Sequence, residues 1–341
     1  MEIVNVAIIG GGPAGLFCAF ECRIMGLNCV LIDALENLGG QCSALYPDKE
    51  ILDIPGLPRI LARNLIASLI DQAEEFTPKY LLGHKVISAA KSGNTWRIHT
   101  GNGKTVVCKS VVIATGGGAF EFNKIPLLEA SQFEGTSLFY AVKNKREMQD
   151  KTVSIIGGGD AALDWAIALA DVAKKINLIH RRDIFKATPI SLKRLKPLLN
   201  QGKVQIFTPF QLSSMNGHSG QLTSIALVSS GLSKNEAPKR LDTDVLLAFF
   251  GLAASRNKFE SWEINVENGR IPVDKATYMT NQSLVYAIGD AALYDGKITS
   301  ILSAFAEGAI VSRSIHKYLG GIAEVNTFSK SDNSNNIWNC H

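Results

Sequence analysis

The fold of this chain is decided by the stretch Val6-Ala7-Ile8-Ile9-Gly10-Gly11-Gly12-Pro13-Ala14-Gly15. A short β-branched run passes here into glycines and then into a helix-forming segment. The glycines have the G-x-G-x-x-G spacing of a dinucleotide-binding turn, in which they allow a tight strand-to-helix connection and a close approach of the backbone to a pyrophosphate. The sequence predicts a strand over residues 3–9 and a helix over 13–26, with its N-terminal end facing phosphates. The expected phosphate-facing residues are Gly10, Gly12, Pro13, Ala14 and Gly15.

An aspartate ends the next expected strand, Cys29-Val30-Leu31-Ile32-Asp33. Asp33 lies 23 positions after Gly10. A carboxylate at this place accepts hydrogen bonds from both hydroxyls of an adenosine ribose. The alternative role of Asp33 is that of a helix-capping or surface residue, and the glycine turn before it favours ribose binding.

The opening stretch is repeated 147 residues later as Val153-Ser154-Ile155-Ile156-Gly157-Gly158-Gly159-Asp160-Ala161-Ala162. Ala162 replaces the third glycine, which the dinucleotide fingerprint allows. Such an internal duplication makes chance an unlikely source of either copy, and it implies two nucleotide sites. The residues expected to contact the second nucleotide are Gly157, Gly159, Asp160 and Ala161.

The same offset carries Asp33 onto His180, which Arg181 and Arg182 follow. A carboxylate here would repel a 2′-phosphate, whereas guanidinium groups bind one with charge-assisted hydrogen bonds. The second site is therefore predicted to prefer NADPH over NADH, chiefly through the two arginines. The alternative is a basic surface turn at the end of a strand.

The bulk properties indicate a globular chain long enough for two domains, with 341 residues, 46% hydrophobic and 19% charged. A formal charge of +4 is too small to indicate nucleic-acid binding. We expect no signal peptide, because the N-terminus enters a strand at once, and no membrane span, because no run of 18 apolar residues occurs. The six cysteines have no zinc-site spacing, so we expect no metal site and a reducing, cytoplasmic location.

The remaining elements follow from periodicity and turn signals. Residues 57–76 have helical periodicity, and residues 80–112 alternate like a small antiparallel sheet with turns at 92–94 and 101–103. Three buried strands are expected to end in glycine, at 111–116, 245–251 and 284–290. The last of these ends in Gly289-Asp290 and leads into a helix over about 299–318. Asp290 is placed to hold a ribityl hydroxyl.

Together these motifs resemble the ferredoxin–NADP reductases of the thioredoxin-reductase-like type over essentially the full chain. The most specific carrier is Gly39-Gly40-Gln41-Cys42-Ser43-Ala44-Leu45-Tyr46-Pro47. The others are the two glycine turns, Ala114-Thr115-Gly116, His180-Arg181-Arg182 and Ala287-Ile288-Gly289-Asp290. The resemblance implies an α/β fold of two Rossmann-like three-layer domains. It implies an FAD-binding domain formed by 1–118 and 256–341, with an NADPH-binding domain, 119–255, inserted between them.

The resemblance also implies roles for individual residues. Tyr46 would stack on one face of the flavin, and the C-terminal extension of the partner in a homodimer would cover the other face. Phe328 is the stacking candidate in that extension, and Ser331 is a further flavin contact, although the segment 327–331 lacks the expected histidine or tyrosine. By position, the FAD ligands would include Asp33, Gln41, Tyr46, Val86, Phe120, Gly289 and Asp290.

What the chain lacks narrows the chemistry. Residues 138–150 contain no C-x-x-C, and Cys42 would need a partner at position 47, which is Pro47. Without an internal dithiol, a flavin here cannot reduce an internal disulfide. The prediction is an enzyme, a ferredoxin–NADP⁺ reductase, that moves electrons between NADPH and ferredoxin or flavodoxin without a catalytic acid, base or nucleophile. The alternatives are an NADPH-dependent flavin reductase or oxidase, a thioredoxin-reductase-like protein with another acceptor, or a non-catalytic redox sensor.

Overall fold

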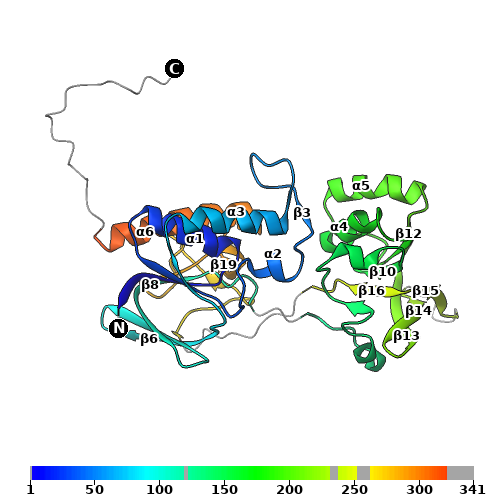
Figure 1. Cartoon of the computed structure of the whole chain (residues 1–341), viewed down its shortest axis with the longest axis horizontal. Coiled ribbons are helices and arrows are strands. Elements are labelled where there is room, and N and C mark those ends of the chain that lie inside the picture. Colours follow the sequence, from blue (N-terminus) through cyan, green and yellow to red (C-terminus); the bar gives the residue numbers. More distant parts are fainter. Residues whose placement is uncertain (1, 119–121, 231–236, 252–261, 321–341) are drawn as a thin grey trace, which may run out of the picture.

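The computed structural model describes residues 2–118, 122–230, 237–251 and 262–320, which form two lobes (Figure 1). The chain begins in the first lobe, drawn in blue and cyan, and continues through the second, drawn in green and yellow. It then returns to the first lobe and forms the last helix there, drawn in orange. Each lobe is built around one sheet.

The first lobe contains a seven-stranded sheet in the order β5-β2-β1-β8-β7-β6, with β18 also paired to β8. On the edge away from β1, the long strand β8 pairs with two strands: its first half pairs antiparallel with β7, and its last residues pair in parallel with β18. The strands are β1 (Ile3–Ile9), β2 (Cys29–Ile32), β5 (Lys79–Leu81), β6 (Val86–Ser92), β7 (Thr95–Thr100), β8 (Thr105–Ile113) and β18 (Val285–Ala287).

Alternation along β1 creates the layers of this lobe. Val6 and Ile8 point to one face and pack against helices, whereas Ala7 and Ile9 point to the other face and pack against β6, β7 and residues 262–292. The covering helices are α1 (Pro13–Ile24), α3 (Ala62–Glu74) and α6 (Ile301–Tyr318), with the short α2 (Gly40–Ala44) beside them. Two-stranded pairs complete the lobe: β3 (Glu50–Ile51) with β4 (Ile60–Leu61), and β17 (Ile271–Pro272) with β19 (Ala292–Leu293).

The second lobe repeats this plan with a parallel five-stranded sheet in the order β12-β11-β10-β16-β9. Val153 and Ile155 of its central strand pack against helices, and Ile156 packs against an antiparallel three-stranded sheet. The parallel strands are β9 (Leu138–Phe139), β10 (Thr152–Ile156), β11 (Lys175–Ile179), β12 (Val204–Phe207) and β16 (Val245–Ala248). The other elements are α4 (Asp160–Leu169), α5 (Pro189–Asn200), β13 (Phe210–His218), β14 (Gln221–Ser229), β15 (Lys239–Asp242) and the 3₁₀ turns η1 (Leu128–Gln132) and η2 (Lys145–Met148).

The predicted duplication of a three-layer α/β unit is therefore confirmed, and two local predictions need correction. The helix expected over 57–76 begins only at Ala62, because Ile60 and Leu61 pair with β3 and Pro58 precedes them. Residues 79–81 belong to a strand parallel to β2 and not to the antiparallel sheet. No helix among the described residues is long and apolar enough to cross a membrane.

Candidate functional site

A cavity of about 980 Å³ lies at the carboxyl ends of β1, β2 and β8 and extends to α4 of the second lobe. Ligands of open α/β sheets bind at this edge, because the loops and helix N-termini meet there. Ten of the residues predicted for the FAD site line the cavity: Gly10, Gly12, Pro13, Ala14, Asp33, Gln41, Tyr46, Val86, Gly289 and Asp290. Residues from distant parts of the chain are thus collected around one space.

Three glycines of the first turn differ in what their neighbours allow. A Cβ on Gly10, whose φ is +113°, would lie 2.3 Å from the carbonyl oxygen of Ala114, and one on Gly15 would lie 1.8 Å from the Gly10 oxygen. A Cβ on Gly12 would meet nothing closer than 3.9 Å. Packing within the protein therefore explains Gly10 and Gly15 but leaves an open cradle beside Gly12. A pyrophosphate against the backbone fits that cradle.

The Asp33 carboxylate is fixed at the rim of the cavity by backbone donors. The N–H of Gly11 donates to its Oδ2 (2.5 Å), and the N–H of Leu35 donates to its Oδ1 (2.7 Å). The first of these bonds ties the aspartate to the glycine turn. Each oxygen keeps a further lone pair, so the carboxylate can still accept hydrogen bonds from a ligand hydroxyl.

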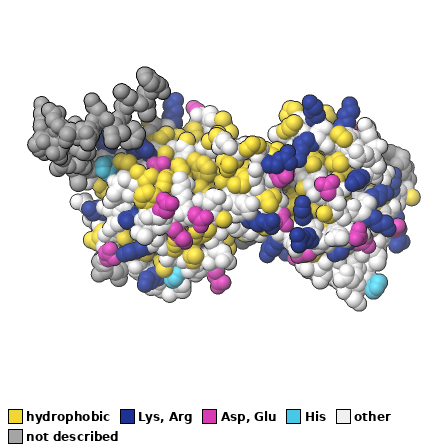
Figure 2. Space-filling view, turned by 45° about the horizontal axis from the view of Figure 1, so that its top comes forward, with side chains coloured by type: hydrophobic (Ala, Val, Ile, Leu, Met, Phe, Trp, Pro, Cys, Tyr) yellow, Lys and Arg dark blue, Asp and Glu magenta, His cyan; other side chains and the backbone are white. Residues whose placement is uncertain are grey.

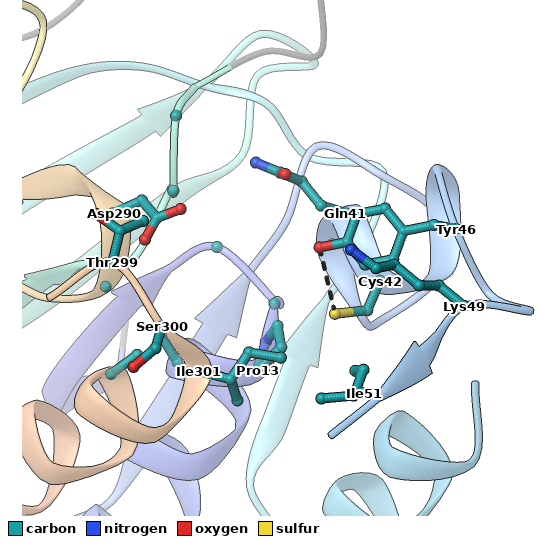
Figure 3. Close-up of a pocket in the computed structure, with 18 of the residues that line it drawn as sticks. Pro13, Gln41, Cys42, Tyr46, Lys49, Ile51, Asp290, Thr299, Ser300 and Ile301 are labelled. Carbon is teal, nitrogen blue, oxygen red and sulfur yellow. Dashed lines mark hydrogen bonds between the residues drawn. The ribbon is translucent and has the colours of Figure 1, made fainter. Parts of the chain in front are cut away.

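Gln41 and Tyr46 lie on one side of the cavity and Asp290 and Thr299 on the other (Figure 3). Burial raises the pKa of the Tyr46 phenol, so it stays neutral and offers a flat apolar face. The Sγ of Cys42 lies 3.8 Å from the Tyr46 hydroxyl. Burial also raises the pKa of the Cys42 thiol, which opposes formation of the thiolate that redox exchange requires.

The N-terminus of α6, the helix expected over about 299–318, forms part of the same wall. Thr299, Ser300 and Ile301 line the cavity, and the Ser300 Oγ accepts the N–H of Ser303 (3.2 Å) as the helix cap. A serine directly before an apolar-periodic run was the available signal for this cap. The structure also adds Lys49, which sequence reasoning had not singled out.

The second glycine turn has the same logic as the first. A Cβ on Gly157 would lie 2.8 Å from the Ala162 side chain, whereas one on Gly159 would meet nothing closer than 3.8 Å. A second open cradle therefore lies at the N-terminus of α4. Asp160 at this helix start lines the large cavity and accepts the N–H of Thr188 (2.8 Å).

The basic cluster after β11 divides into a packed histidine and exposed arginines. The His180 ring stacks on Phe185 with centroids 5.4 Å apart, and it fills the space that a side chain on Gly158 would need. Burial and the neighbouring guanidinium groups of Arg181 and Arg182 lower the pKa of His180. The positive charge at the strand end is therefore carried by the arginines, both of which are exposed.

Residues 48–50 make polar contacts between the two lobes. Lys49 forms an ion pair with Asp164 of α4 (2.9 Å), and Glu50 pairs with Arg194 of α5 (3.6 Å). The carboxylate of Asp48 accepts the backbone N–H of Lys145 (3.2 Å). The segment begins two residues after Tyr46, so the predicted flavin-stacking residue is close to the contact between the lobes. Phe120, Phe328 and Ser331 lie outside the described residues.

The fold and the paired glycine turns define a protein with two dinucleotide-binding lobes. Residues 4–308 match the family model described as pyridine nucleotide-disulphide oxidoreductase, and the chain belongs to that family. Its fold is similar to that of thioredoxin reductase from T. acidophilum, with a TM-score of 0.81 and 21% identity over 94% of this chain and 99% of the other.

Two curated relatives have a higher sequence identity to this chain and show which family within this class it belongs to. The chain is 41% identical to a protein named ferredoxin–NADP reductase from Anaplasma phagocytophilum, over 93% of each chain. It is 43% identical to one of the same name from Wolbachia pipientis of Culex pipiens, over 92% of this chain and 94% of the other. Within the larger class, the chain belongs to the family of the ferredoxin–NADP reductases. This confirms the resemblance inferred from the sequence.

Proposed function

We propose that the protein is an FAD-dependent oxidoreductase that transfers electrons between NADPH and a one-electron carrier, ferredoxin or flavodoxin. The observation that carries this proposal is the contrast between the two glycine turns. The first turn is tied to Asp33 by the Gly11 N–H, and the second is followed by the exposed Arg181 and Arg182. An acid suits a ribose with free hydroxyls, and arginines suit a 2′-phosphate. The relatives named ferredoxin–NADP reductase support the choice of acceptor.

The first lobe is the proposed FAD site and the second the proposed NADPH site. When bound, FAD supplies the chemistry that joins a hydride donor to a one-electron carrier. The chain itself binds and orients: the open side of Gly12 receives the pyrophosphate, Asp33 the ribose, Tyr46 the flavin ring and Asp290 the ribityl chain. The Cys42 thiol takes no part. The proposed domain limits are 1–118 with 256–341, and 119–255.

A homodimer in the cytoplasm is the proposed assembly and location. Support for self-association comes from apolar side chains on the helical face of the first lobe, where Phe17 contacts Phe20 and Phe305 with centroids 5.7 and 4.9 Å apart. Phe76 stands against Phe20, and Leu302 on α6 is 46% exposed. Figure 2 shows hydrophobic side chains gathered over this lobe, while Lys and Arg spread over the second. Apolar faces of this kind mark interaction surfaces.

The test is a coupled assay on FAD-loaded protein, with NADPH or NADH as donor and ferredoxin-dependent cytochrome reduction as readout. We expect NADPH to support turnover that depends on added ferredoxin or flavodoxin. If dyes are reduced but neither carrier is, the NADPH-dependent flavin reductase or oxidase becomes the better assignment. If NADH serves as well as NADPH, the role given to Arg181 and Arg182 is wrong.

A further inference from the structure

A buried ion pair lies directly behind the cavity wall. Glu307 of α6 is 1% exposed and the Lys297 side chain 4% exposed, and the Lys297 ammonium group donates to Glu307 Oε1. The same oxygen accepts the hydroxyl of Tyr294 (2.8 Å), and Oε2 accepts the backbone N–H of Gly289 (2.6 Å). One carboxylate thus gathers three donors.

Stability alone explains such a pair poorly. Removing two charges from water costs several kcal/mol per ion, and well-packed apolar residues often replace a buried pair without loss. The best-supported reason to retain buried ionic groups is that they fix one arrangement of the chain. The arrangement fixed here is that of Gly289, since its N–H is the only backbone donor that Glu307 accepts among the described contacts.

Gly289 is the point where the loop after β18 meets the glycine turn. Its φ is +65°, and a Cβ there would lie 3.2 Å from Ala14 of α1 and 3.9 Å from Ala304 of α6. The next residue, Asp290, lines the cavity. The carboxylate of Glu307 therefore holds the loop at the point where it lies between the first turn of α1 and the first turn of α6.

We propose that the Lys297–Glu307 pair is a positioning device for the flavin site, which holds the Gly289 backbone and sets the charge environment of Asp290. This inference rests on the proposed FAD site. Neither side chain lines the cavity, so both act through the loop and do not touch the cofactor.

The charge environment of Asp290 depends on the titratable and charged groups around its carboxyl. Burial raises the pKa of Asp290, the cations of Lys297 and Arg270 oppose this, and Glu307 adds to it more weakly than Lys297 opposes it. Cys42 and Tyr46 also face this carboxyl and carry no charge at neutral pH, because the pKa of each is raised. Removal of the whole pair should therefore raise the pKa of Asp290 further.

The test measures FAD dissociation constants of the apoprotein by fluorescence quenching from pH 5 to 8, together with apoprotein melting temperatures. The variants are Lys297→Met, Glu307→Gln and the double variant. Arg313→Met is the matched control, since Arg313 lies on the same helix and pairs with Glu21 (2.7 Å) away from the cavity. Each single variant should weaken FAD binding about tenfold or more, as expected when a charged hydrogen bond is lost.

The double variant separates positioning from stability, because it leaves no unpaired buried charge. Its apoprotein should melt near the wild-type temperature. As the pH is lowered, however, its FAD affinity should fall at a higher pH than that of the wild type, because an Asp290 with a raised pKa takes up its proton earlier. Wild-type affinity and an unchanged pH profile in the double variant would overturn the proposal, as would an equal loss in Arg313→Met. A wild-type apoprotein that does not bind FAD would overturn the proposed function itself.

Discussion

At the scale of single residues, Gly12 and Gly15 belong to one turn but are glycines for different reasons. The space beside Gly15 is filled by the Gly10 carbonyl, whereas the space beside Gly12 is open to the cavity. The backbone of Gly12 is extended, with a φ of −73°, so conformation does not demand a glycine there either. The open space beside Gly12 therefore supports the proposed position of the pyrophosphate.

Alanine substitutions should separate these two causes. Gly15→Ala should destabilise the apoprotein by several kcal/mol, because its methyl group would overlap the Gly10 oxygen. Gly12→Ala should leave the free energy of unfolding of the apoprotein within about 1 kcal/mol of the wild-type value. It should nevertheless lose FAD, since it alters only the cradle. Calorimetry of the apoprotein and flavin content after purification measure both. A Gly12→Ala protein that retains full flavin would contradict the proposed pyrophosphate position.

The arginines after β11 provide a second residue-scale prediction. Arg181→Ala with Arg182→Ala should raise the KM for NADPH about tenfold to a hundredfold, the range expected for lost charge-assisted hydrogen bonds, and leave the KM for NADH unchanged. His180→Ala should have a smaller effect, because the lowered pKa leaves that ring uncharged at neutral pH. Steady-state kinetics with both donors decide. Equal losses for NADPH and NADH would show that the arginines do not read the 2′-phosphate.

Most of this site was accessible from sequence because its parts are local. The glycine turn and Asp33 follow from spacing within one βαβ unit, whereas the roles of Gln41 and Tyr46 came only from the family resemblance of residues 39–47. The Lys297–Glu307 pair was not accessible, because nothing in the spacing of a lysine and a glutamate on adjacent elements shows that both are buried. The same holds for Lys49, whose partner Asp164 lies in the other lobe.

At the scale of elements, the segment around β3 carries two ion pairs between the lobes. Its side chains reach both helices of the second lobe, through Lys49 with Asp164 on α4 and Glu50 with Arg194 on α5. Each pair is partly exposed, and such pairs contribute about 0–1 kcal/mol individually.

Breaking both pairs should therefore widen the range of lobe positions without unfolding either lobe. Spin labels can be placed at the exposed positions Lys91 of β6 and Lys239 of β15, one in each lobe. In the double variant Lys49→Met with Arg194→Met, the distribution of distances between these labels should become broader. The native thiols in the described residues are buried, so Cys340 is the native cysteine that we would replace, by Ser, before cysteines for the labels are introduced at positions 91 and 239. A distance distribution as narrow as that of the wild type would show that other contacts fix the lobes.

At the scale of the whole molecule, the exposed apolar face of α6 predicts the state of assembly. Leu302→Glu should convert a dimer into a monomer in light scattering, because Leu302 is exposed on that face and does not line the cavity. Leu128→Glu is the control, since Leu128 is 96% exposed on η1 in the second lobe. A dimer that withstands Leu302→Glu places the interface elsewhere.

The pairing of β18 with β8 also determines the order in which the chain can fold during synthesis. The Oγ of Ser110 donates to the carbonyl of Leu284, 174 residues later, and the register from Val111 to Ile113 is completed only by residues 285–287. The sheet of the second lobe lies wholly between these strands in the chain. On a ribosome that extends the chain from the N-terminus, the inserted lobe is complete first, while the lobe that begins the chain waits for its last strand. Nascent chains stalled soon after residue 251 have emerged should resist protease across 138–248 before residues 3–113 do.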